Sequence, residues 1–307
     1  MMGTRHHITA VTLTLATLGT LSACVGGDDE PTIVVTTNIL GDVVDNLVGD
    51  HAEVTVLMKP NSDPHSFGIS AKQAGAMEDA DLIIGNGLGL EEGLSANLDN
   101  ARSEGVPVLE VGEEIEPIDY VSGGSAGTPD PHFWTDPTRM VTAVDAITSA
   151  LGEEVGEGLA EAIEPSVRAY RERLVDLDSE IEEITEEIPV EGRKLVTNHH
   201  VFGYFAKRFD FEVIGAVLPS GTTLASPSAA DLEELARTVE TAGVPTIFAD
   251  SSQPQKLAQA LSEEVDLDVD VKPLFSESLT EADGEAGTYI DMQRTNAQRI
   301  AEGLVPR

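Results

Sequence analysis

Short segments of β-forming residues alternate with helix-forming segments twice along this chain. The β-rich segments are 32–37, 52–58, 80–85 and 106–111 in the first half, and 193–198, 212–218, 245–250 and 269–275 in the second. Helix-compatible sequences such as ILGDVVDNLVG and SAKQAGAMEDA lie between them. Parallel strands need crossover connections of this kind, so the alternation is typical of parallel sheets covered by helices. It predicts an α/β protein with two lobes.

An unusually regular apolar stripe lies between the two halves. Its members recur at steps of three and four residues: Val167, Tyr170, Leu174, Leu177, Ile181, Ile184 and Ile188. This spacing predicts an amphipathic helix, and from Pro165 to Glu187 such a helix would extend about 34 Å. A helix of that length can reach across both lobes. The same spacing is also compatible with the seam of a coiled-coil dimer, which the sequence alone leaves open.

The N-terminus has the pattern of an export signal. MMGTRHH carries one arginine, an apolar run follows at residues 8–21, and the small residues Ser22 and Ala23 come next. The run is too short to span a bilayer. Cys24, the single cysteine of the chain, then ends the sequence LSAC. LSAC is similar to the lipobox of bacterial-type lipoproteins, which implies a lipid on Cys24; a buried free cysteine is the alternative.

These features divide the 307 residues into five segments. We expect a signal peptide at 1–23, a flexible polar tether at 24–31, an N-terminal α/β lobe at 32–157, a lobe-spanning helix at 158–188 and a C-terminal α/β lobe at 189–307. Beyond residue 23 we expect no segment that crosses a membrane.

The chain is strongly acidic. Its 55 acidic and 18 basic residues give a formal charge of −37, and removing residues 1–23 takes away Arg5 and no acid, which leaves −38. This balance argues against nucleic acid and anionic membrane surfaces as partners. The acids are scattered, which is typical of a solvated surface.

A tripeptide that contains histidine occurs twice. Residues 63–65 and 130–132 both read Asp-Pro-His, and an aromatic residue follows each within two positions. His65 and His132 each come after a predicted strand, as does His199. Ligands of open α/β sheets bind beyond the carboxyl ends of the strands. We therefore expect His65, His132 and His199 to point into one crevice.

A carboxylate completes this set. Glu277 follows the last predicted strand, so two ligands would come from each lobe. Three imidazoles and one carboxylate form a four-coordinate set that suits Zn²⁺. Asp63 and Asp130 are candidates to accept a hydrogen bond from each imidazole and orient it. Asp136-Pro137 is typical of a helix start, so a helix should begin shortly after His132.

Other residues near these positions have simpler interpretations. His200 adjoins His199, and spacing alone does not separate the two. His51 is expected in a turn, and Phe67 and Trp134 are expected to pack against the histidine segments.

The ordered set DPHSF, DPHFWTDP, HHVFGYFAKRF, SPSAADLEEL, LFSES and TYIDMQRTNAQRI resembles the zinc and manganese group of solute-binding lipoproteins of ATP-binding cassette importers. The resemblance covers about residues 33–300. It implies two four-stranded lobes joined by a long, stiff helix, with one metal ion between them. It also selects His199 over His200, and it places Glu277 where the family usually has an aspartate.

The resemblance further implies a function outside the cytoplasm. We expect a protein, anchored by lipid to the outer face of the cytoplasmic membrane, that delivers metal to a permease and its ATPase, most simply as a monomer. Nitrogen donors favour Zn²⁺, whereas the absence of histidine from the loop at 112–131 departs from many zinc members and keeps Mn²⁺ open. An adhesin or structural lipoprotein with a stabilising metal is one alternative. A zinc hydrolase is another, although no HExxH pattern supports an enzyme.

Overall fold

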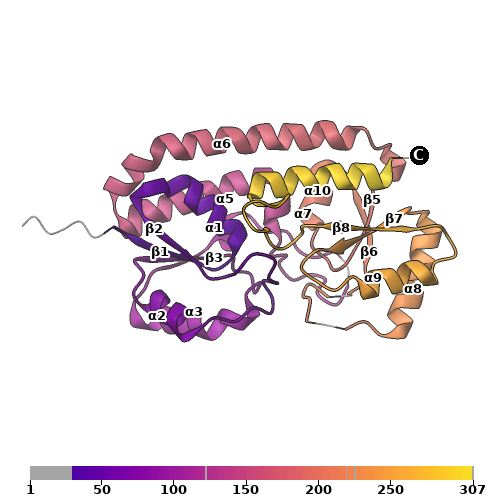
Figure 1. The fold of residues 1–307 in the computed structure, drawn as a ribbon, viewed down its shortest axis with the longest axis horizontal. Helices are drawn as coiled ribbons and strands as arrows, with labels where there is room; N and C mark the ends of the chain where they lie inside the picture. The colour runs from indigo at the N-terminus through magenta and orange to yellow at the C-terminus, as the bar shows by residue number, and fades with distance from the viewer. Residues whose placement is uncertain (1–29, 122, 219, 225, 306–307) are drawn as a thin grey trace, which may run out of the picture.

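The computed structural model describes residues 30–305 apart from residues 122, 219 and 225. The expected signal peptide, Cys24 and most of the tether lie outside the described residues. Figure 1 shows two α/β lobes side by side, with one long helix, α6 (Glu157–Glu186), crossing both of them. The predicted fold class is confirmed.

The N-terminal lobe contains a four-stranded sheet whose strands all run parallel, in the order β2-β1-β3-β4. The strands are β1 (Thr32–Val35), β2 (Glu53–Val56), β3 (Leu82–Gly85) and β4 (Val108–Glu110). The central strand β3 is buried along its whole length, as expected for a sheet with helices on both faces. The strand predicted at 106–111 is shorter than expected because the short helix α4 (Val111–Glu114) begins at its last residue.

The C-terminal lobe repeats this arrangement with the order β6-β5-β7-β8, again all parallel. Its strands are β5 (Lys194–Thr197), β6 (Glu212–Ala216), β7 (Thr246–Asp250) and β8 (Asp270–Leu274). In both sheets the first strand of the lobe pairs with the second and the third.

Helices cover both faces of each sheet. Those of the N-terminal lobe are α1 (Asn38–Val48), α2 (Ala71–Glu78), α3 (Ser95–Glu104) and α5 (Pro137–Ala150); those of the C-terminal lobe are α7 (Gly203–Phe209), α8 (Ala229–Ala242), α9 (Lys256–Glu264) and α10 (Tyr289–Leu304). The predicted start of α5 is confirmed, because Asp136 caps the helix by accepting a hydrogen bond from the Thr138 amide and Pro137 is its first residue.

The long helix α6 packs on its own chain. Its buried residues are Ile163, Val167, Tyr170, Leu174, Leu177, Ile181 and Thr185, and they face α1, α5 and α10. A helix of 30 residues is about 45 Å long, enough to cross both lobes. Because the apolar stripe is already covered by α1, α5 and α10, the coiled-coil alternative is wrong.

The helix α6 begins before its proline. Its first residue, Glu157, lies one residue before the segment expected at 158–188 and eight residues before Pro165, where the apolar stripe alone would place the first turn. Gly156, with φ 140°, separates it from the preceding helical turn. Pro165 lies inside the helix at the cost of one hydrogen bond to the Glu161 carbonyl. The buried Ile163 extends the stripe on the N-terminal side of the proline and compensates for that loss.

The apolar interior has three parts. The largest contains residues from both lobes and from α6, among them Val43, Leu174, Phe205 and Leu274. A second core lies between the C-terminal sheet and α8 and α9, and a third lies between the N-terminal sheet and α2 and α3. The layer formed by α1, α5, α6, α7 and α10 is therefore shared by the two lobes, whereas the outer layers are separate.

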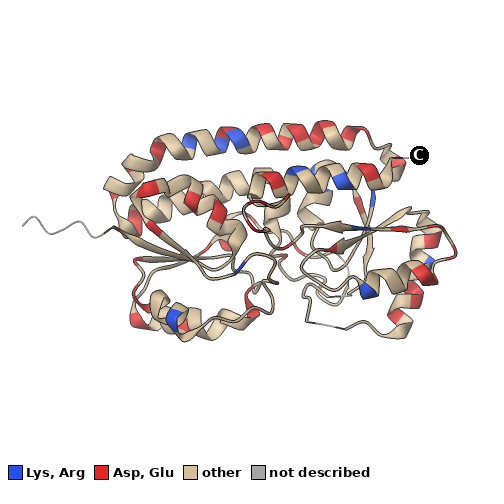
Figure 2. Ribbon diagram, viewed as in Figure 1, with Lys and Arg blue, Asp and Glu red and all other residues tan. Residues whose placement is uncertain are grey.

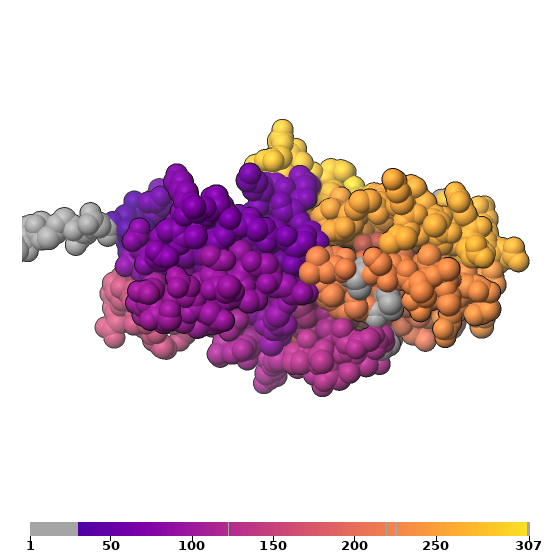
Figure 3. Space-filling view, turned by 90° about the horizontal axis from the view of Figure 1, so that it is seen from below, coloured from indigo at the N-terminus to yellow at the C-terminus, as the bar shows by residue number. Residues whose placement is uncertain are grey.

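Figure 2 shows acidic residues spread over both lobes and along α6, with few basic residues among them. Figure 3 shows the two lobes in contact along their boundary. Among the described residues no helix combines the length and the apolar character needed to cross a bilayer.

Candidate metal centre

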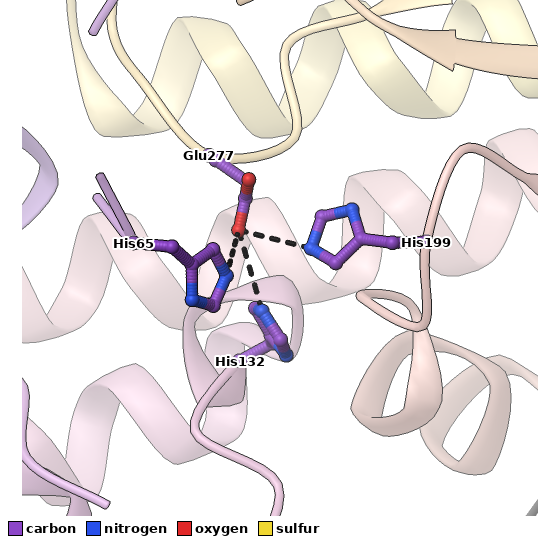
Figure 4. A group of neighbouring side chains, drawn as sticks. All are labelled: His65, His132, His199 and Glu277. Carbon is purple, nitrogen blue, oxygen red and sulfur yellow. Dashed lines mark hydrogen bonds and ion pairs between the residues drawn. The ribbon is translucent and has the colours of Figure 1, made fainter. Parts of the chain in front are cut away.

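Four polar side chains meet between the lobes (Figure 4). His65 lies in the loop between β2 and α2, and His132 directly precedes the short 3₁₀ helix Phe133–Thr135. His199 follows β5, and Glu277 follows β8. The structure thus brings together all four residues expected in the crevice, two from the chain of each lobe.

The four side chains surround one small volume. Glu277 Oε1 lies 3.0 Å from His65 Nε2, 3.1 Å from His199 Nε2 and 3.3 Å from His132 Nε2. The four potential ligand atoms all lie within 4.8 Å of one another. In a tetrahedral zinc site with bonds of about 2.0 to 2.1 Å, neighbouring ligand atoms are about 3.3 to 3.4 Å apart. The distances from the carboxylate oxygen to the three nitrogens are therefore close to those needed around one ion.

Burial makes this arrangement costly unless a cation is held there. His132 and His199 are 0% exposed, and His65 and Glu277 are 1% exposed. Glu277 Oε2 and His132 Nε2 have no hydrogen-bond partner among the described residues. Buried polar atoms normally have partners, and an uncompensated one costs about 1 to 3 kcal/mol. A bound cation would give His132 Nε2 a partner.

The charge of the cluster follows from its neighbours. Burial alone would raise the pKa of Glu277, but the imidazoles of His199 and His65 and the hydrogen bonds to the cluster hold that pKa well below its ordinary value. Glu277 is consequently ionised at neutral pH and can act as an anionic ligand.

His132 is oriented by Asp130. Asp130 Oδ1 lies 2.7 Å from His132 Nδ1 and also accepts the backbone N–H of His132 at 2.9 Å. Burial lowers the pKa of His132, yet Asp130 and Glu277 outweigh burial and raise it to about 9. With Nδ1–H donating to Asp130, Nε2 points to the centre of the cluster, which is the tautomer that a metal requires.

Tyr120 covers the outer side of His132. Its hydroxyl lies 3.2 Å from His132 Nδ1 and donates a hydrogen bond to the Gly221 carbonyl at 3.2 Å. Tyr120 comes from the long loop at 112–131, and Gly221 belongs to the other lobe. That loop therefore helps to close the site.

Asp63 does not have the role expected of it. The sequence suggested that it would accept a hydrogen bond from the His65 ring, but His65 Nδ1 has no partner among the described residues. Asp63 Oδ1 instead accepts the backbone N–H of His65, and Oδ2 accepts from Thr223 at 2.6 Å and from Gln253 at 2.9 Å. Both oxygens are occupied by other donors, so Asp63 fixes the loop and not the ring.

Comparison with known proteins identifies the family of this chain. A family model described as ZnuA, zinc-uptake complex component A, periplasmic, matches residues 33–303. The chain belongs to this family.

Relatives of this ZnuA-family chain match over nearly their full length. The zinc-binding protein TroA of Treponema pallidum is 31% identical over 309 residues, covering 98% of this chain and 99% of TroA. A solved structure of TroA superposes with a TM-score of 0.83 at 30% identity, covering 90% of this chain and 100% of that one. The manganese-binding lipoprotein MntA of Bacillus subtilis is 29% identical over 297 residues, covering 95% of this chain and 96% of MntA.

The remaining residues singled out in this ZnuA-family sequence lie outside the four-residue cluster. His200 is partly buried beside Tyr120, with ring centroids 6.5 Å apart, and burial lowers its pKa. His51 is exposed at the end of a short 3₁₀ helix. Phe67 packs on the outer core of the N-terminal lobe, and the Trp134 ring contacts the His132 ring edge to face at 5.2 Å.

Sequence reasoning missed two groups that support the ligands in this ZnuA-family site. Asn86 Nδ2 donates to the Pro131 carbonyl, directly before His132, and the buried Glu91 holds the turn that carries Asn86. Asn38 contacts the segment that carries Glu277. A weak signal was present, because each asparagine is a polar residue close after an apolar strand.

Proposed function

We propose that this protein binds a divalent transition-metal ion outside the cytoplasm and delivers it to an ATP-binding cassette permease. His65, His132, His199 and Glu277 supply the ligands. The observation that carries the proposal is the buried cluster of three imidazole nitrogens and one carboxylate oxygen, all within 4.8 Å of one another. Membership of a zinc-uptake family supports the same conclusion.

Zn²⁺ is the proposed ion, with Mn²⁺ as the alternative. Relatives are named for both metals, so their names do not decide between them. The donor set favours Zn²⁺, because imidazole nitrogens bind zinc more strongly than manganese and a four-ligand site suits tetrahedral zinc.

The location and partners form part of the proposal. Residues 1–23 would direct export, a lipid on Cys24 would anchor the chain to the outer face of the cytoplasmic membrane, and residues 24–31 would tether the lobes at 32–157 and 189–307, which the helix at 158–188 joins. The partners would be the permease and, through it, its ATPase, with the protein acting as a monomer. The formal charge of −37 argues against nucleic acid as a partner.

We propose binding and not catalysis. Glu277 would fill the fourth position of a tetrahedral ion, which leaves no place for the metal-bound water that a zinc hydrolase activates.

The test is a metal titration of the purified protein. We expect about one Zn²⁺ per chain, tighter binding of Zn²⁺ than of Mn²⁺ in competition with a chromogenic chelator, and release within minutes when excess chelator is added. His132→Ala should lower the affinity for Zn²⁺ at least 100-fold, because it removes one of four ligands. His51→Ala, at an exposed histidine, should leave the affinity unchanged.

Equal affinity in the His132→Ala and unaltered proteins would reject the ligand assignment. Zinc that stays bound for days in excess chelator would favour a stabilising metal in a structural lipoprotein over a delivered one.

A further inference from the structure

The segment that carries Glu277 belongs to the C-terminal lobe by sequence, yet several of its hydrogen bonds go to the N-terminal lobe. The Trp134 indole N–H donates to the Ser276 carbonyl at 2.8 Å. On the other side of Glu277, the Asn61 amide donates to the Leu279 carbonyl at 2.9 Å. The acidic ligand is thus bracketed by contacts that cross the boundary between the lobes.

Asn38 makes the most extensive of these contacts. Its amide group donates to Ser278 Oγ at 2.8 Å and to the Lys59 carbonyl at 3.2 Å, and its Oδ1 accepts the Leu279 amide at 3.0 Å. Asn38 is 7% exposed and Ser278 is 3% exposed, so water competes little for these bonds. The Asn38 side chain therefore forms hydrogen bonds with both residues that directly follow Glu277.

Asn38 itself is rigidly held. It is the first residue of α1, directly after the capping Thr37 and at the carboxyl end of the central strand β1. Its position is consequently fixed by the N-terminal sheet.

The residues just before Glu277 are also bound to their own lobe. The Phe275 amide donates to Asn296 Oδ1 on α10 at 2.9 Å, and the Ser276 hydroxyl donates to Asp250 at the end of β7. Glu277 lies between an anchor on the C-terminal lobe and an anchor on the N-terminal lobe. The segment that presents its carboxylate to the three histidines is therefore held by hydrogen bonds to both lobes.

We propose that Asn38 is a positioning residue that holds Glu277 against the three histidines and makes metal retention depend on contact between the lobes. This inference rests on the proposed function, because it concerns the same site. Loss of Asn38 would remove its two hydrogen bonds to Ser278 and Leu279 and leave the Asn61 contact. The fourth ligand would then leave the ion more often, and release would be faster.

The test is the rate of zinc release into excess chelator from the purified protein. Supporting groups around metal ligands typically contribute about 10- to 100-fold in affinity. We expect Asn38→Ala to accelerate release by about that factor, and Ser278→Ala to accelerate it as well. Because the two side chains bond to each other, the double variant should release zinc at nearly the rate of Asn38→Ala alone.

Asn100→Ala is the matched control. Asn100 is an exposed asparagine on α3 that also donates a hydrogen bond, to Glu78, but it lies on the outer layer of the N-terminal lobe. Its removal should leave the release rate unchanged. Melting curves of the metal-free variants separate positioning from stability. If Asn38 had only a structural role, its substitution would lower the melting temperature, but the effects of Asn38→Ala and Ser278→Ala on the release rate would be independent of each other.

Release rates of Asn38→Ala within twofold of the unaltered protein would overturn the inference, as would effects of Asn38→Ala and Ser278→Ala that multiply in the double variant. If Asn38→Ala does not fold, the Ser278→Ala rate decides the question by the same twofold criterion. Failure of the unaltered protein to bind Zn²⁺ or Mn²⁺ would overturn the proposed function itself, which this experiment detects first.

Discussion

His132 and Asp130 set the protonation of the cluster. Burial opposes a charge on His132, but the adjacent Asp130 carboxylate and Glu277 raise the pKa of His132 to about 9. At pH 7 the metal-free imidazole is therefore protonated, whereas a metal ligand must be deprotonated. An incoming ion has to displace that proton.

The affinity for Zn²⁺ should consequently rise with pH. At pH values well below the pKa of about 9, protonation of His132 weakens zinc binding, and each pH unit upward reduces this weakening about tenfold. We expect the dissociation constant to fall about tenfold from pH 6.5 to 7.5 and about eightfold from pH 7.5 to 8.5, in a chelator competition titration at constant ionic strength. A dissociation constant that stays the same from pH 6.5 to 8.5 would contradict the assignment of His132.

Asp130→Asn provides the comparison for this prediction. Asparagine can still accept the Nδ1–H of His132 but lacks the charge that raises its pKa. The pH dependence of zinc affinity between pH 7.5 and 8.5 should therefore be weaker in the variant.

The two Asp-Pro-His tripeptides show what residue-level prediction can and cannot reach. Asp130 contacts its histidine ring, as the sequence suggested, whereas Asp63 does not. The difference arises from Thr223 and Gln253, which are 160 and 190 residues away from Asp63 in the chain and donate to its carboxylate. A local motif cannot reveal partners that only the fold brings near.

At the scale of elements, two adjacent residues of α6 differ in their exposure to water. Leu174 is 0% exposed in the shared core, and Val175 is 56% exposed on the outer side of the same helix. The stripe in the sequence predicted which side is buried. The stripe alone did not indicate the start at Glu157, because an interior proline is indistinguishable from a first-turn proline without knowledge of what packs beneath it.

Leu174→Ala should lower the free energy of unfolding by about 2 to 5 kcal/mol, because it leaves a cavity in a filled core. Val175→Ala should change it by less than about 0.5 kcal/mol. Urea unfolding followed by circular dichroism measures both. Equal effects of the two substitutions would show that the stripe is not buried in solution.

The strands and helices of both lobes were largely predictable, since alternating β-rich and amphipathic segments with caps such as Asp136 specify parallel sheets locally. Sheet order was less accessible, because it depends on contacts between residues far apart in the chain. The four candidate ligands could be chosen because each is a residue type that binds metal and lies in a segment after a predicted strand. Asn38 and Asn86 also follow strands, but nothing near either residue in the sequence indicates the loop that it contacts.

At the scale of the whole molecule, the formal charge of −37 should make stability depend on salt. Like charges repel one another in the compact state, and the screening length falls from about 10 Å at 0.1 M salt to about 3 Å at 1 M. We expect the melting temperature of the metal-free protein to rise with KCl, with most of the rise below about 0.5 M. A melting temperature that stays constant or falls as KCl is added would contradict this prediction. A rise that stays linear up to high KCl concentration would indicate that the salt is excluded from the protein surface, and not that it screens charge.

The interior shared by both halves has a consequence for how the chain can be divided. A fragment ending near residue 188 would keep α6 but lose α10, and would present to water the side of α6 that α10 covers. The complementary fragment would lack α6 as a support for α10. The two similar halves are therefore not autonomous modules. They form one cooperative folding unit, and an ion held at its centre would stabilise every part of it at once.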